Sequence, residues 1–78
     1  MNIRFFAGAA DAAGTQEQQL AGPMTLGALR AALTHAHGPE FARVLGRCSL
    51  MVDGVRAGDE AWIDESATVD VLPPFAGG

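Results

Sequence analysis

Residues 68–78 read Thr68-Val69-Asp70-Val71-Leu72-Pro73-Pro74-Phe75-Ala76-Gly77-Gly78, an alternating apolar segment followed by two prolines and a Gly-Gly end. The alternation predicts a strand over residues 68–72 with Val69 and Val71 facing the core. The prolines fix φ and lack N–H donors, so they end the pairing of this strand. Glycine adds the slimmest and most flexible backbone. We therefore expect a folded domain with a flexible C-terminal tail, residues 73–78.

The reactive group of this tail is expected to be the α-carboxylate of Gly78. A carboxylate becomes an electrophile once one of its oxygens is converted into a leaving group, for example by adenylation with ATP. A sulfur nucleophile or an amine can then attack it. Gly77 places no side chain beside it, which helps the terminus to enter a narrow pocket of another enzyme. The alternative is a frayed end without function, and the dipeptide alone does not decide between the two.

Composition predicts one small domain, residues 1–78, with 49% hydrophobic residues and a net charge of −4. No apolar run approaches the roughly 20 residues of a membrane helix, and the first residues lack the features of a signal peptide. We therefore expect a cytoplasmic protein without a membrane partner. A nucleic-acid partner is not expected either, because there is no basic stripe. The sequence has no lysine, and its basic residues are Arg4, Arg30, Arg43, Arg47 and Arg56.

The first strand is predicted over residues 2–7, with Ile3 and Phe5 facing the core. Arg4 and Phe6 then lie on the other side of the strand. A large aromatic residue on the open face of a sheet hints at a surface for a partner, although single exposed apolar residues are common.

The middle of the chain predicts two helices and further strands. A short turn closed by Gly14 precedes an edge strand over residues 15–20. Thr25 is a good N-cap for a helix over residues 25–37, whose leucines recur at helical spacing: Leu26, Leu29 and Leu33. A second short helix is expected over residues 40–46, a strand over 49–53, a hairpin at Asp53-Gly54, and a segment over 61–63 docked on the core. The order β-β-α-α-β-β-β indicates an α+β fold, with a small mixed sheet on one main helix.

The sequence shows no recognisable set of catalytic side chains. Cys48 is the single cysteine and lies in an apolar run, which favours a buried inert thiol. His35 and His37 are two apart on a helix and point in different directions, so ordinary helix-end histidines are preferred over a metal pair. Asp64 and Glu65 are interpreted as a solvated turn. Trp62 is expected in the core or at its rim.

Several of these segments together resemble the small, sulfur-carrying subunit of molybdopterin synthase, in the MoaD/ThiS family of ubiquitin-like sulfur carriers. The resemblance rests on Phe5-Phe6-Ala7 at the end of the first strand, Gly14, the leucine helix from Thr25, Val52-Asp53-Gly54, and the Pro-Pro-x-x-Gly-Gly end. It covers essentially the whole chain. It implies a β-grasp fold and a chain that is not an enzyme on its own.

The resemblance also implies partners and roles. An E1-like enzyme would adenylate Gly78 with ATP, and a sulfur donor would convert it to a thiocarboxylate. The large synthase subunit would receive the tail in a heterotetramer and transfer the sulfur to cyclic pyranopterin monophosphate. No cofactor would be bound stably. Gly78 is then the reacting residue and Gly77 gives it access, while the expected partner-binding residues are Phe6, Pro74, Phe75 and Ala76.

One segment departs from the family pattern, and two other functions stay open. Relatives often carry a glycine turn before the last strand, whereas this chain has Asp64-Glu65-Ser66-Ala67, so we expect another turn type there. The same fold and tail would also serve a sulfur carrier for thiamine or cysteine synthesis. A ubiquitin-like protein modifier, or a plain interaction domain, is the third possibility.

Overall fold

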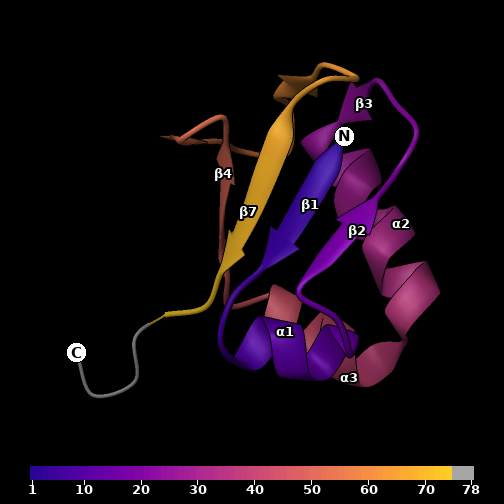
Figure 1. Cartoon of the computed structure of the whole chain (residues 1–78), viewed down its shortest axis with the longest axis vertical. Helices are drawn as coiled ribbons and strands as arrows, with labels where there is room; N and C mark the ends of the chain where they lie inside the picture. The colour runs from indigo at the N-terminus through magenta and orange to yellow at the C-terminus, as the bar shows by residue number, and fades with distance from the viewer. Residues whose placement is uncertain (75–78) are drawn as a thin grey trace.

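A computed structural model of the chain describes residues 1–74. It contains a mixed five-stranded sheet, most of which can be followed in Figure 1. The strand order is β2 (Glu17–Gln19), β1 (Asn2–Phe5), β7 (Thr68–Leu72), β4 (Ser49–Val52) and β5 (Val55–Arg56). β1 and β7 run parallel at the centre, and the other neighbours are antiparallel. The predicted α+β class is confirmed, as are the edge strand and the hairpin.

A second sheet, which the sequence did not predict, lies at the other end of the domain from the C-terminal ends of β1 and β7 (Figure 1). It consists of β3 (Met24–Thr25) and β6 (Trp62–Ile63), paired antiparallel. Ile63 is fully buried, whereas Trp62 is 66% exposed. The expectation that Trp62 packs in the core or at its rim is therefore wrong. Successive residues of a strand point to opposite faces, and Ile63 takes the inner one.

The main helix α2 (Leu26–His37) begins at a well-satisfied N-terminus. Thr25 is the N-cap, as predicted, and its Oγ1 accepts a hydrogen bond from the Ala28 N–H at 3.2 Å. The backbone carbonyls of Ala61 and Asp59 accept from the next free N–H groups, those of Leu26 and Gly27, each at 2.9 Å. The loop before β6 thus completes a cap that would otherwise need water.

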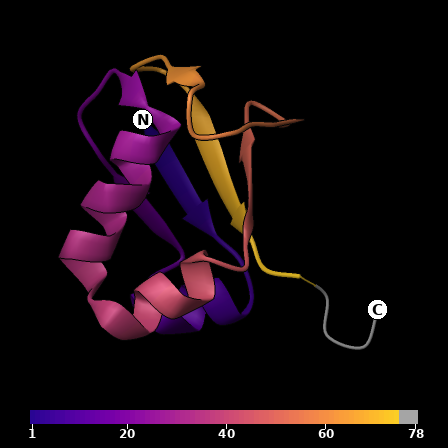
Figure 2. The ribbon, with the colours of Figure 1, turned by 180° about the vertical axis from the view of Figure 1, so that it is seen from behind.

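The core lies between the sheet and the helices. α1 (Gly8–Ala13) and α3 (Pro39–Leu45) gather at the end of the sheet where β1 and β7 finish, and α2 runs along one side (Figure 2). The predicted leucine stripe of α2 is confirmed. The largest fully buried side chains are Ile3, Leu26, Leu29, Leu33, Phe41, Leu50, Ile63, Val69 and Val71.

Two turns position the last strand. Asp53 (φ 49°) and Gly54 (φ 83°) both have positive φ, as a tight two-residue hairpin requires. The Asp53 backbone N–H donates to the Thr68 carbonyl, and the Asp53 Oδ1 accepts from the Thr68 N–H. Asp53 therefore also fixes the beginning of β7.

The turn before β7 needs no glycine, because Asp64 organises it. The Asp64 Oδ2 accepts from both the backbone N–H and the hydroxyl of Ser66, at 3.1 and 2.6 Å. These bonds stabilise the charged carboxylate and lower the pKa of Asp64 below its ordinary value. Among residues 1–74, no helix has the length and apolar character required to cross a membrane.

Candidate functional site: the outward sheet face and the root of the tail

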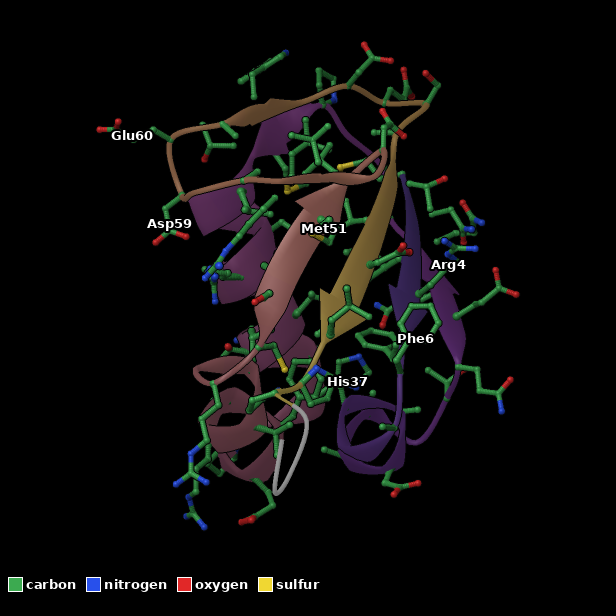
Figure 3. The ribbon with its side chains drawn as sticks, turned by 90° about the vertical axis from the view of Figure 1, so that its left-hand side faces the viewer. Arg4, Phe6, His37, Met51, Asp59 and Glu60 are labelled. Atoms are coloured by element: carbon green, nitrogen blue, oxygen red, sulfur yellow. The ribbon has the colours of Figure 1, made fainter. Side chains whose placement is uncertain are left out.

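The outward face of β1 carries the exposed aromatic residue that the sequence predicted. Ile3 and Phe5 are buried, and Phe6 is 38% exposed just beyond the strand. Arg4 lies beside it, with its guanidinium carbon 5.7 Å from the centre of the Phe6 ring (Figure 3). A guanidinium over an aromatic face adds a modest attraction.

Arg4 is held in place by the neighbouring strand. Its Nε and Nη2 donate to the two carboxylate oxygens of Asp70 on β7, at 2.6 and 2.8 Å. The hydrogen bonds and the charge of Asp70 raise the pKa of Arg4. This two-pronged geometry fixes the guanidinium plane, so Phe6 and Arg4 form a shaped surface.

Ala7 turns the chain sharply after Phe6, with φ 49° and ψ −125°. A non-glycine residue rarely adopts a positive φ, and such positions occur often at functional sites. A shallow hollow of about 380 Å³ lies beside this turn. Its walls come from the end of β1, from Ala10 of α1 and from the beginning of β2 with the residue before it, and they include Arg4, Phe6, Gln16 and Glu17.

The root of the tail emerges from the middle of the sheet. β7 pairs with β1 on one side and with β4 on the other, where Ser49 lies opposite Leu72. The Phe6 N–H donates to the Val71 carbonyl at 3.2 Å. The backbone of Phe6 is therefore bonded directly to the end of β7. Pro73 is half-buried and Pro74 is exposed. The tail residues predicted to react or to bind, Phe75, Ala76, Gly77 and Gly78, lie outside the described residues.

The other candidate residues that the sequence raised, His37 and Cys48, are engaged in contacts within the fold. His37 packs against the rings of Phe5 and Phe41, and its Nε2 lies 2.6 Å from the Gln18 Oε1, so it joins the end of α2 to the edge strand β2. Cys48 is half-buried rather than fully buried, and its Sγ–H donates to the Val44 carbonyl at 3.2 Å.

Cys48 is predicted to react slowly. Burial raises the pKa of its thiol, an effect that nearby Arg30 only partly offsets. Since the thiolate is the nucleophile, iodoacetamide at pH 8 should alkylate the folded chain several-fold more slowly than the urea-unfolded chain. The difference should shrink as the pH rises above both pKa values. Equal rates at pH 8, measured by mass, would show an accessible reactive thiol.

Sequence reasoning missed the Arg4–Asp70 pair. Both residues carry charge at outward positions of strands that are otherwise apolar, and their opposite charges could have indicated a cross-strand ion pair. Their contact, however, depends on the parallel register in which Arg4 lies opposite Asp70, across 66 positions of sequence.

Comparisons with known proteins agree with this architecture. The ThiS family profile matches residues 3–78. SAMP1 from Haloferax volcanii superposes with a TM-score of 0.81 at 26% identity, over 100% of this chain and 98% of that one. The small archaeal modifier protein 1 from Methanosarcina acetivorans gives 0.84 at 24% identity, over 99% and 94%.

A third solved structure is a complex of subunits 1 and 2 of the molybdopterin-converting factor from Helicobacter pylori. It gives a TM-score of 0.73 at 20% identity, over 99% of this chain and 96% of that one. The search of curated proteins found no match. The family match spans nearly the whole chain, and the neighbours share its ubiquitin-like β-grasp topology; the chain therefore belongs to the ThiS family, as a small sulfur carrier of the ThiS/MoaD type.

Proposed function

We propose that the chain is the sulfur-carrying small subunit of a molybdopterin synthase. The observation that carries the proposal is the position of Pro73 and Pro74, from which the tail continues. The strand that leads to Pro73-Pro74 is the central one, paired on both sides, and Phe6 with Arg4 lies directly beside its end. This arrangement suits a rigid domain that docks on a partner while a slim terminus enters the partner's active site.

The proposed chemistry takes place at the Gly78 carboxylate. On an E1-like enzyme, a carboxylate oxygen attacks the α-phosphate of ATP, and pyrophosphate leaves. The outer sulfur of a persulfide on a cysteine-desulfurase or rhodanese-type donor then attacks the carbonyl carbon and AMP leaves, which gives an acyl disulfide. A thiol attacks the donor's sulfur in that disulfide, forms a new disulfide with it and releases the thiocarboxylate. The large subunit takes the tail and transfers the sulfur to cyclic pyranopterin monophosphate. The catalytic side chains belong to that subunit, and ATP is consumed by the activating enzyme.

The support for this acceptor comes from the fold shared with the converting-factor complex and from the Pro-Pro-x-x-Gly-Gly end. A second candidate, a ubiquitin-like modifier joined to protein lysines, is favoured by the likeness to the two SAMP1 structures. Deletion of the gene separates these functions. Loss of molybdoenzyme activity that molybdopterin restores supports the synthase, thiamine auxotrophy supports the ThiS-type acceptor, and lost lysine adducts support the modifier.

The direct test is the mass of the chain isolated from its own cells without a C-terminal tag. Exchange of one oxygen for sulfur adds about 16 Da, nearly the same as one methionine oxidation, so the peptide carrying Gly78 must be sequenced. We expect the added mass on that peptide, together with alkylation at its terminus at a pH where Cys48 is protonated. A terminus that is always a plain carboxylate would contradict the proposal.

Phe6 is predicted to anchor the chain on its partner. Phe6→Ala should weaken binding to the large subunit by roughly 10- to 30-fold, since truncated aromatic anchors often cost about 2 kcal/mol. Titration calorimetry with the purified large subunit measures the change. The matched control is Trp62→Ala, which removes a more exposed aromatic residue from the second sheet and should leave binding unchanged. Binding by Phe6→Ala that is as tight as that of the unchanged chain would remove Phe6 from the interface.

A further inference from the structure

The amines of this chain are unusually few. All five basic residues are arginines, and a guanidinium stays protonated in proteins and is no nucleophile at neutral pH. The α-amine of Met1 is therefore the sole aliphatic amine in the 78-residue sequence. This matters because an activated carboxylate reacts readily with amines.

The Met1 amine is held inside the fold. It donates to the carbonyls of Leu20 and Glu65, both at 2.7 Å, and Met1 is only 5% exposed. The Met1 carbonyl accepts in turn from the Leu20 N–H at 3.0 Å. The Met1 side chain packs so closely on Gly22 that an added Cβ there would lie 3.2 Å from the Met1 Sδ. Attack on a carbonyl carbon needs an open approach to the nitrogen, and the burial of Met1 and the two hydrogen bonds of its amine hinder that approach.

The strongest sulfur nucleophile is restrained in a similar way. Cys48 is half-buried, and its Sγ–H is directed at the Val44 carbonyl. The exposed imidazole of His35 remains open to solvent. Acylation of an imidazole, however, gives an activated amide that water hydrolyses, so it leaves no stable adduct.

We propose that this chain is built to resist acylation by its own activated C-terminus, so that the acyl group or its sulfur is kept for a nucleophile of a partner protein. The inference rests on the proposed function, because an unactivated carboxylate poses no such hazard. The reaction prevented is attack of an amine nitrogen on the Gly78 carbonyl carbon. In it a C–N bond forms, the bond to the leaving group breaks, and the amine proton passes to solvent. A chain of this kind can be joined to other proteins singly but does not extend into polymers of itself.

The test uses the 78-residue chain with Gly78 as a chemically prepared thioester of mercaptoethanesulfonate. The native thioester is kept at high concentration at pH 8 and followed by intact mass, alone and with a short lysine peptide whose N-terminus is acetylated. The positive controls are the variants Arg56→Lys and Arg47→Lys, each of which places a primary amine at an exposed position. The native chain should hydrolyse and should acylate the peptide. The lysine variants should form covalent dimers about tenfold faster or more, since an ammonium, unlike a guanidinium, deprotonates readily.

A second measurement addresses the amine directly. Acetylation of Met1 by an N-hydroxysuccinimide ester should be much slower in the folded chain than in urea. Native dimers joined at Met1 or Cys48 at the rate of the variants, or equal labelling of Met1 in the two states, would overturn the inference. The thioester is made without any cellular enzyme, so such a result would not bear on the sulfur-carrier proposal. That proposal is tested separately by the mass of the chain isolated from its own cells.

Discussion

Deleting Gly78 is expected to abolish sulfur transfer while leaving the domain folded. Loss of one residue retracts the terminal carboxylate by about 3.5 Å along an extended chain. A reacting atom misplaced by only about 1 Å can lower a rate roughly 100-fold, so transfer should fall by more than about 100-fold. The measurement is molybdopterin formation in a mixture of the chain, the activating enzyme, a sulfur donor and the large subunit. The urea midpoint should not change, because the strand pairs of β7 end at Leu72.

Two further variants, a control outside the tail and a change within it, separate the position of the carboxylate from the character of the tail. Trp62→Ala changes an exposed residue of the second sheet and keeps the tail intact, so transfer should be retained. Gly77→Val keeps a terminal carboxylate but places a branched side chain beside it, and transfer should fall steeply without loss of stability. Full transfer by the chain that lacks Gly78 would show that the position of the terminal carboxylate does not control transfer, and the proposed role of Gly78 would fail.

Local sequence patterns predicted the elements that have a clear hydrophobic period or a distinctive turn sequence. The three leucines at helical spacing gave α2, Asp53-Gly54 gave the hairpin, and alternation gave β7 with its buried valines. The second sheet escaped prediction because each of its strands has two residues, which is too short to show a period. Its pairing joins Thr25 to Trp62 across the chain, and that contact decides which of Trp62 and Ile63 faces the core.

In the candidate site, too, local patterns predicted some features, whereas others depend on contacts between distant segments. Phe6 was predicted to be exposed, since burying Ile3 and Phe5 leaves it on the open side of the strand. The pairing of Arg4 with Asp70 depends on the parallel alignment of the first and last strands, which no local pattern contains. The seated amine of Met1 likewise depends on carbonyls of Leu20 and Glu65 that only the folded topology brings together.

Leu29→Ala is expected to destabilise the domain by about 2–5 kcal/mol, since Leu29 is fully buried at the middle of the α2 stripe and the shortened side chain leaves a cavity. The effect is large relative to the whole. A domain of 78 residues has a free energy of unfolding of roughly 4–12 kcal/mol. Each kcal/mol shifts the melting temperature of a domain of this size by about 4–8 °C, so Tm should fall by about 10 °C or more.

Urea unfolding followed by circular dichroism measures this loss, provided that the denaturant slope stays unchanged, which shows that both states keep their compactness. Val55→Ala is the control. It also shortens an aliphatic side chain, but Val55 is 68% exposed on the edge strand β5, and its loss should change stability by no more than about 0.5 kcal/mol. A loss of only tenths of a kcal/mol for Leu29→Ala, equal to that of the control, would mean that α2 does not bury this face against the sheet. The docking surface of Phe6 and Arg4 would then lack the rigid support on which the proposed delivery of the tail depends.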